Sequence, residues 1–466
     1  MRRRRSTGVS FFEQVDAILD NELIYELGEL IPMPPPEHGG RPRDFPNWAY
    51  VFYGALVTAC RSARRVETEL DSVMWEYVRE RVVERFPSRP EMWLPEKPMA
   101  RHHWEYVRST YLVNDEVIGA LRDRFTLGAC EQAEALGLCE TNGRGSLTHP
   151  DLSRMLYADG KVVTPLYRAK PGTRQVDRTT GESRPVRADP DAKLHITGSG
   201  EPAYGNKFVL VSCRANTPHG RMILNFDHVP TAGGEAQVAL ACIAQLAPLL
   251  AGAHGVLYDG AFRGVHLQEL LHERGLLPVV PVAAAAGGRR ARRPRTERTV
   301  AIERKRLGDG RVVELVARAG QLGVVELDEG GETVFVPLVR RKIDRRRNAD
   351  GTWRWYGTFA LPDELGGSEI LVRLDTTDED RCRKFNRTEH LRPIPPADAD
   401  YRRLYPRRSD AESINRSLDD SLWLRRAHSV GARRQLVDLL GFAIAVNSVA
   451  LFRARHSNDP PTQAAA

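Results

Sequence analysis

Apolar residues recur every three or four positions in the first part of the chain, which is the spacing of one face of a helix. The repeat is clear over residues 12–23, breaks at the proline-rich stretch 32–36, and returns over residues 48–59 and 66–86. We therefore expect a helical region over residues 1–146.

Basic residues separate the last two of these helices. Arg61, Arg64 and Arg65 lie between residues 48–59 and 66–86. Two short helices joined by a basic turn are typical of a helix-turn-helix, which places its second helix in the major groove of DNA. The same pattern also fits a plain helical hairpin. We favour DNA binding because of the chemistry found later in the chain.

The pattern changes to strands at about residue 147. Short apolar runs then alternate with longer amphipathic runs, in the order strand, strand, strand, helix, strand, helix, strand. This order predicts an α/β fold, with a mixed sheet flanked by helices. The polar stretch 167–192 has the composition of a mobile loop. The strand-like runs are residues 155–166, 207–213, 222–226, 254–258 and 276–283, and the helical runs are residues 234–252 and 266–274.

A β-rich segment interrupts this α/β core. Residues 287–298 form a linker of glycine and arginine, and residues 300–374 contain many short strand-like runs separated by turn signals. Helical pattern returns from about residue 410. The predicted organisation is the first part of the core over residues 147–286, a β-rich insertion over 287–400 whose all-β part is residues 300–374, C-terminal helices of the core over 401–455, and a disordered tail over 456–466.

The most apolar run, residues 436–452, bears on whether the chain crosses a membrane. It contains Asp438 and Asn447 and is short for a bilayer span, which needs about 20 apolar residues. A buried helix is the better interpretation, and we expect no membrane partner. The N-terminal Met-Arg-Arg-Arg-Arg lacks the apolar run of a secretory signal. We therefore expect a cytoplasmic, nucleoid-associated protein.

The formal net charge is only +7, but the arginines are clustered. Such clusters are the electrostatic signature of proteins that bind phosphate backbones. A GC-rich genome, which favours arginine codons, is the alternative explanation for any single cluster. The clusters lie at residues 2–5, 289–298, 340–347 and 402–408.

Three acidic residues stand where a metal site could assemble. Asp159 lies inside the first strand, where a carboxylate between apolar neighbours is costly unless it is paired or bound to a metal. Asp259 ends a later strand just before a helix, a common place for sites in α/β sheets. Glu412 opens the C-terminal helical region. Carboxylates that converge from different elements can hold the two Mg²⁺ ions, about 3.5–4 Å apart, that cut and join phosphodiesters.

The order strand-Asp, strand-Asp, β insertion, helix-Glu resembles that of the bacterial DDE transposases of the insertion-sequence-four type. In that family the third acid sits in the signature Tyr-x2-Arg-x3-Glu-x6-Lys, and Tyr405, Arg408 and Glu412 match its spacing. The segment that contains Asp259, YDGAFRGVHLQELLHERGLLPVVPV, is similar to the family's second-aspartate block. The resemblance covers residues 147–455.

The resemblance implies a ribonuclease H-like fold and a transposase that cuts DNA at insertion-sequence ends and joins the freed 3′-hydroxyl to target DNA. Asp159, Asp259 and Glu412 would bind Mg²⁺ or Mn²⁺, and Tyr405 and Arg408 would contact DNA phosphate near the cleavage point. The implied partners are double-stranded DNA, as transposon ends and target, and a second copy of the chain in a homodimer on the DNA.

Asp419 stands where the family has its lysine. A lysine would contact phosphate, whereas an aspartate offers no such contact and adds repulsion. Two explanations remain open: either Arg416, Arg425 or Arg426 binds the phosphate instead, or this copy of the enzyme is impaired.

Aromatic residues in the β insertion are candidates for base stacking. Trp353 and Trp355 follow the basic run 340–347, and the resemblance implies that the insertion approaches the transposon end, where an aromatic ring stacks on a flipped base. Such stacking contributes about 1–3 kcal/mol. The alternative is cross-strand packing of aromatic rings within a sheet. Lys207 faces either phosphate or, more simply, solvent.

Two further functions fit the same residues. A nuclease with the same core would cut DNA without joining it. A catalytically impaired or domesticated transposase-derived protein would only bind DNA, which is the interpretation that Asp419 favours.

Overall fold

The computed structural model describes residues 9–456, except for 35–42, 71–72, 178, 197–199, 216, 218–219, 283–297 and 328–329. The predicted tail therefore lies outside the described residues apart from His456, and so does the predicted linker apart from Arg298. The chain divides into two compact units. Unit 1 comprises Met1–Leu136, Gly160–Glu235 and Ser413–Ala466, and unit 2 comprises Gly137–Asp159 and Ala236–Glu412.

Unit 1 contains the helices expected in the N-terminal region and one long helix from the C-terminal part of the chain, α14 (Ala432–His456). Helix α14 contacts α1, α3 and α7. Its approach to α3 requires a glycine, because a Cβ atom on Gly441 would lie 2.5 Å from the carbonyl oxygen of Gly54. The other helices are α1 (Phe11–Leu19), α2 (Leu23–Glu29), α3 (Asn47–Cys60), α4 (Ala63–Glu69), α5 (Val73–Arg85), α6 (Arg101–Val107) and α7 (Asp115–Ala135).

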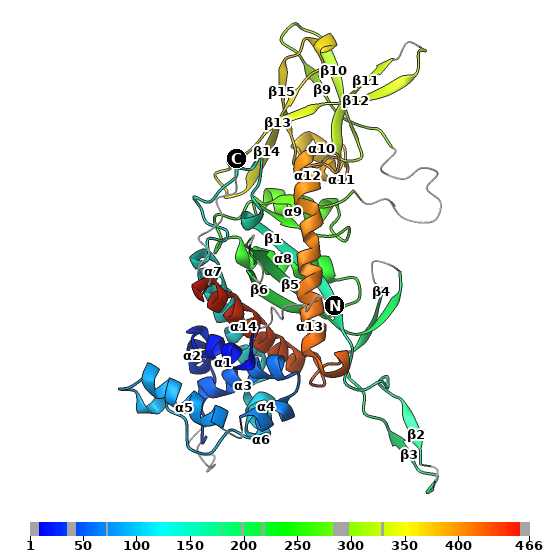
Figure 1. Cartoon of the computed structure of the whole chain (residues 1–466). Helices are drawn as coiled ribbons and strands as arrows, with labels where there is room; N and C mark the ends of the chain where they lie inside the picture. Colours follow the sequence, from blue (N-terminus) through cyan, green and yellow to red (C-terminus); the bar gives the residue numbers. More distant parts are fainter. Residues whose placement is uncertain are drawn as a thin grey trace, which may run out of the picture. The chain divides into compact units, whose positions relative to one another are not determined.

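Helix α14 contains the apolar run that the sequence predicts as a buried helix, and that prediction is confirmed. Among the described residues it is the one helix long and apolar enough to cross a bilayer, but 78% of that stretch is buried inside the protein. The Asn447 amide bonds both the backbone N–H and the carbonyl of Ile223 in strand β6, each at 2.8 Å. Asp438 pairs with Arg108 at 3.0 Å. These internal partners identify α14 as a core helix of unit 1, lying against β6 (Figure 1).

A six-stranded mixed sheet has the order β4-β5-β1-β7-β8, with β6 paired to β5. Strands β5 and β6 are antiparallel, whereas β7 is parallel to both β1 and β8. The predicted α/β class is therefore confirmed. The strands are β1 (Met155–Val163), β4 (Lys193–Ile196), β5 (Pro202–Arg214), β6 (Arg221–Val229), β7 (Gly255–Leu257) and β8 (Leu277–Val279), and the helices after β6 and β7 are α8 (Glu235–Leu246) and α9 (Gly264–His272).

The stretch 167–192, expected to be a loop, instead contains a hairpin of two short antiparallel strands, β2 (Arg174–Val176) and β3 (Ser183–Pro185). All six residues of these strands are exposed. They carry no alternation of buried and exposed positions, which is why the pattern of the sequence did not reveal them.

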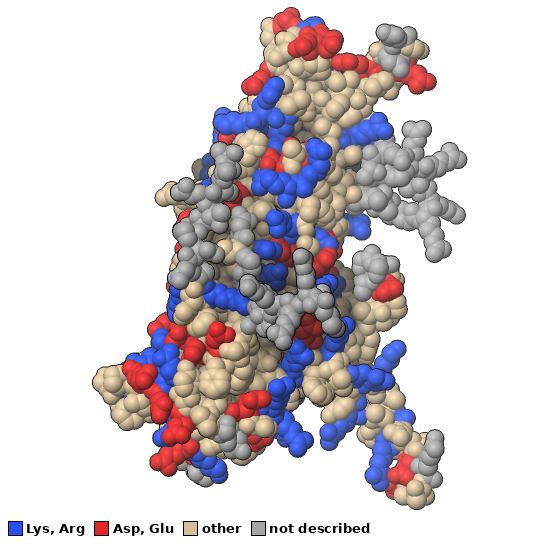
Figure 2. Space-filling view, in the orientation of Figure 1, with Lys and Arg blue, Asp and Glu red and all other residues tan. Residues whose placement is uncertain are grey.

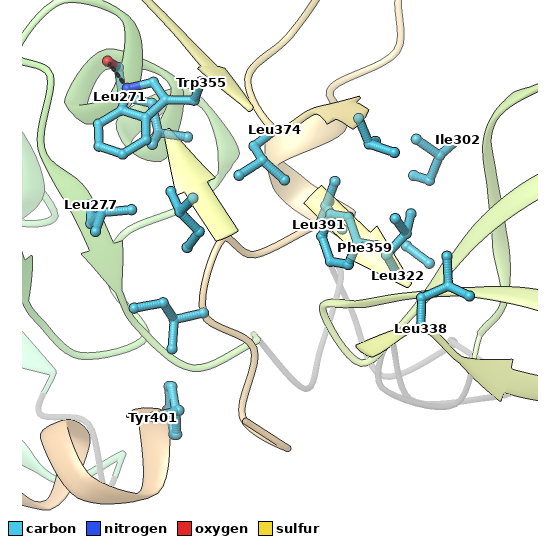
Figure 3. Close-up of a cluster of buried hydrophobic side chains, with 14 of the residues drawn as sticks. Leu271, Leu277, Ile302, Leu322, Leu338, Trp355, Phe359, Leu374, Leu391 and Tyr401 are labelled. Atoms are coloured by element: carbon cyan, nitrogen blue, oxygen red, sulfur yellow. Dashed lines mark hydrogen bonds between the residues drawn. The ribbon is translucent and has the colours of Figure 1, made fainter. Parts of the chain in front are cut away.

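Residues 300–373 of unit 2 form two antiparallel sheets, with strand orders β12-β11-β10-β9 and β13-β14-β15. Their buried side chains join those of β7, β8 and α9 in one hydrophobic core (Figure 3). The strands are β9 (Val300–Arg306), β10 (Val312–Arg318), β11 (Gln321–Leu327), β12 (Thr333–Pro337), β13 (Val339–Arg347), β14 (Trp353–Ala360) and β15 (Glu369–Arg373). The helices that follow are α10 (Asp378–Cys382), α11 (Arg387–His390), α12 (Ala399–Leu404) and α13 (Ser409–Ser421).

Candidate metal centre

Strand register brings the two predicted aspartates together. Strands β1 and β7 run parallel with Tyr157 opposite Leu257. Asp159 and Asp259 each follow these residues by two positions, so the register places the two aspartates beside each other. The Asp259 carboxylate also accepts the Ala261 backbone N–H at 2.8 Å, which fixes the turn after the strand.

A third carboxylate, that of Glu235, completes the cluster. Asp159, Glu235 and Asp259 are all half-buried, and one oxygen of each lies within 4.8 Å of the others. Glu235 is the first residue of α8. Three converging carboxylates provide the hard oxygen ligands that Mg²⁺ and Mn²⁺ prefer, so this set of donors suits a divalent cation.

The place of the Glu235 side chain depends on a neighbouring glycine and a lysine. A Cβ atom on Gly160 would lie 2.2 Å from a Glu235 carboxylate oxygen, so no larger residue fits there without displacing that carboxylate. Lys207, in β5, forms a salt bridge with Glu235, and both side chains are largely buried. Lys207 therefore neither points to solvent nor stands free for a phosphate, and it offsets part of the negative charge of the cluster.

Glu235 could not be recognised as a candidate ligand from the sequence. Its only signal was an acidic residue at the start of an apolar helix after two glycines. An acid in that position ordinarily compensates the helix dipole. Nothing in the spacing indicates that it faces two strands.

Glu412 lies outside this group of three carboxylates. It sits in the first turn of α13 with 53% of its side chain exposed, and it forms a salt bridge with Arg408. A guanidinium nitrogen of Arg408 also lies 4.0 Å from an Asp159 carboxylate oxygen. Of the three acids expected to bind metal, the structure brings two together and links the third to them through Arg408.

Arg408 is held as a cation by its neighbours. Burial alone would lower its pKa, but Glu412, Tyr405, Asp159 and Asp259 together raise the pKa above its ordinary value. The pKa of Tyr405 is raised by burial, against the opposing effect of Arg408. Its ring stacks on that of Tyr401, with the ring centroids 4.8 Å apart. The signature residues thus lie beside the acid cluster as a neutral phenol and a positive charge.

Asp419, which stands where the resembling family has a lysine, has a charged partner within unit 1. The carboxylate of Asp419 accepts from the Lys161 ammonium at 2.5 Å. Lys161 follows Asp159 by two positions in β1, and alternate residues of a strand share a face. A lysine is therefore present on the strand instead of on the helix.

The other cations considered for this role differ in what holds them. Arg416 is exposed on α13 and forms no salt bridge within the described part of the chain. Arg425 is likewise exposed, in the turn after α13. Arg426 donates to the Leu166 carbonyl at 3.2 Å.

The two tryptophans of β14 have different environments. Trp355 is fully buried and donates its indole N–H to the Leu271 carbonyl at 2.7 Å (Figure 3). No face of its ring is open to a base, so Trp355 packs within the sheet and does not stack on DNA. Trp353 is half-buried, and the guanidinium of Arg345 lies 4.4 Å from the centroid of its ring.

Part of the basic run 340–347 serves the fold. The Arg340 side chain is 6% exposed and binds both Asp398 oxygens, at 2.7 and 2.9 Å, and Asp400 at 2.8 Å. Burial lowers the pKa of Arg345, which donates to the Gly275 carbonyl. These two arginines are committed to internal partners and are not free to bind phosphate.

Comparison of the sequence with models of known protein families finds no match, and comparison with curated proteins finds none either.

Proposed function

We propose that this protein is a DNA transposase that hydrolyses a phosphodiester with divalent metal and then joins the freed 3′-hydroxyl to target DNA. The observation that carries the proposal is the cluster of Asp159, Glu235 and Asp259, placed by a parallel strand pair and the start of a helix. We further propose that the α/β core is ribonuclease H-like, with the first aspartate on the central strand β1.

In this proposal the three clustered carboxylates hold Mg²⁺ or Mn²⁺. When bound, a pair of such ions activates the attacking oxygen and stabilises the leaving oxygen of the phosphodiester. The residues of the chain then bind and orient the phosphate, which is the task that the adjacent cations suit.

Glu412 and the phosphate of a bound DNA would compete for Arg408. In the free protein it pairs with Glu412. An entering phosphate offers Arg408 a bidentate partner of higher charge. We propose that phosphate displaces Glu412 from Arg408 and thereby frees Glu412 to join the metal ligands.

Lys161 would make the phosphate contact that the resemblance assigns to a lysine on the helix. Its ammonium is paired with Asp419 and lies on the same strand face as Asp159. The pair supports an intact site, because it supplies a cation where the sequence alone indicated a loss. DNA ends and a second copy of the chain remain the partners that we propose.

The test is cleavage of DNA that carries the native flanks of the reading frame, with and without Mg²⁺. We expect Asp159→Asn to reduce the cleavage rate by at least about 100-fold, since it removes a metal ligand. Asp309→Asn, in an exposed turn between β9 and β10, is the matched control and should cleave at the wild-type rate.

The same assay separates the two glutamates and the rival nuclease. Glu235→Gln should weaken metal binding even without DNA, whereas Glu412→Gln should impair only cleavage. Products in which the 3′ end is joined to a second DNA indicate a transposase, and cut ends alone indicate a nuclease. Metal-independent cleavage, or equal rates for Asp159→Asn and Asp309→Asn, would refute the proposal.

A further inference from the structure

An arginine-lined cavity of about 490 Å³ lies within unit 1. Its walls come from the α3–α4 junction, from α6, from the chain after β1 and from the turn after α13. Six arginines line it, against one carboxylate, that of Glu105. The six are Arg61, Arg64, Arg101, Arg108, Arg168 and Arg426.

Four of these six arginines have no counter-charge among the described residues. Arg101 pairs with Glu105 at 3.4 Å, and Arg108 pairs with Asp438 at 3.0 Å. Of the other four, Arg426 donates to the Leu166 carbonyl. The last three are exposed and form no salt bridge with any described residue. They are Arg61, Arg64 and Arg168. Like charges gathered on one cavity repel each other, and an anionic ligand relieves that repulsion.

Aromatic groups line the same cavity. Trp423 is 61% exposed, which leaves its indole open to stack on a planar ligand. Trp104 lies buried in the wall, and its indole N–H has no hydrogen-bond partner among the described residues. Exposed aromatic rings beside arginines are the combination that binds single nucleic-acid strands, through base stacking and phosphate contacts.

The positive charge continues beyond the cavity. Arg168 leads directly into the β2–β3 hairpin, and Figure 2 shows blue side chains along this projecting segment. An extended polyanion can use the whole surface, whereas a small phosphate would fill only the cavity. The exposed cations of the hairpin are Lys170, Arg174, Arg184 and Arg187, against the acids Asp177 and Glu182.

We infer that the arginine-lined cavity and the β2–β3 hairpin bind a strand of DNA, with its backbone on Arg61, Arg64 and Arg168 and one base stacked on Trp423. The inference uses residues of unit 1 alone and needs no metal. It deepens the proposed function, because it assigns a place on the chain where DNA would be held.

The experiment measures binding of fluorescently labelled single-stranded and double-stranded oligonucleotides by anisotropy, in EDTA, over a range of salt. Arg64→Ala is compared with Arg65→Ala. These neighbours share helix α4 and carry the same charge, but Arg65 pairs with Glu69 and does not line the cavity. We expect Arg64→Ala to weaken binding and to flatten the salt dependence by roughly one ion, with no change for Arg65→Ala. The double variant Arg64→Ala/Arg168→Ala should weaken binding about tenfold and flatten the salt dependence by roughly two ions.

Trp423→Ala supplies an independent test of the stacked base. It should weaken single-strand binding by about tenfold or more. Circular dichroism confirms that each variant is folded. Equal affinities for the Arg64 and Arg65 variants would overturn the inference, as would competition by millimolar pyrophosphate that displaces DNA completely. Asp159→Asn should bind normally, so a failure of the cleavage proposal would leave this result standing.

Discussion

Asp159 and Lys161 lie on one face of β1, so a single strand carries both a candidate metal ligand and a cation. Asp419 holds Lys161 at 2.5 Å in the free protein. Both side chains are about a quarter exposed or less, which leaves the pair within reach of a ligand. Such a pair can exchange its internal carboxylate for a phosphate when DNA arrives.

The Lys161–Asp419 pair predicts how single substitutions change the cleavage rate. Lys161→Ala should lower the cleavage rate by about 10- to 100-fold while metal affinity stays unchanged, because a phosphate contact is lost and no ligand is removed. Adding Asp419→Lys to that variant puts a lysine back on the helix and should restore a measurable part of the rate. Steady-state cleavage and Mn²⁺ titration provide the readouts, with Asp420→Lys as the control for added charge. A double variant no faster than Lys161→Ala would contradict the assigned role.

The residues of the candidate metal site differ in how clearly the sequence indicates them. Asp159 and Asp259 could be predicted because Asp159 lies within β1 and Asp259 follows the apolar strand β7 by two residues, positions where an acid is conspicuous. Glu235 could not, because its position at a helix start is ordinary and its partners depend on strand register. Trp353 and Trp355 share a face of β14, and only the depth of the core along that strand separates the half-buried ring from the buried one.

At the scale of elements, helix α14 and strand β6 are joined by one side chain. Asn447 is fully buried and satisfies both backbone groups of Ile223, beside an irregularity in the β5–β6 register at Val211 and Ser212. The irregularity diverts the ladder, and the amide supplies the missing partners. The buried amide of Asn447, on an otherwise apolar face of α14, therefore completes an interrupted sheet.

This junction predicts a loss of stability without a loss of chemistry. Asn447→Ala leaves a buried N–H and a buried carbonyl without partners, which should lower the free energy of unfolding by about 2–4 kcal/mol. Urea denaturation measures the change, and Arg455→Ala, exposed in the last turn of the same helix, is the control. A change below about 0.5 kcal/mol for Asn447→Ala would show that the amide is not what satisfies Ile223.

The elements that could be predicted are those with a strong period. The N-terminal helices, α14 and strands β1, β5, β6, β7 and β8 of the mixed sheet combine apolar runs with clear breaks. Strand β4, with one buried residue of four, has no such run and was not predicted. The hairpin β2–β3 could not be found because every residue of its strands is exposed. Its stability depends on backbone pairing alone, which leaves no hydrophobic pattern in the sequence.

At the scale of the whole molecule, each compact unit combines segments that are far apart in the sequence. Unit 1 includes both the first helices and α14, and unit 2 places residues 300–373 in one core with β7, β8 and α9. The sequence predicts one interruption of the core, between residues 286 and 401, but nothing in its composition indicates that the first helices share a unit with α14. The modest charge of +7 likewise hides its distribution: six arginines surround one cavity, while Arg340 and Arg345 are committed to the fold.

Calorimetric titration of the DNA-free protein with Mn²⁺ tests directly whether Asp159, Glu235 and Asp259 form a metal site. We expect saturable binding that Asp159→Asn and Glu235→Gln each weaken by at least about tenfold, because each removes one of the clustered carboxylate ligands. Glu412→Gln and the control Asp309→Asn should bind as the wild type does. Wild-type protein that binds no Mn²⁺, or a Glu235→Gln variant that binds as tightly as wild type, would contradict the assignment of this metal site.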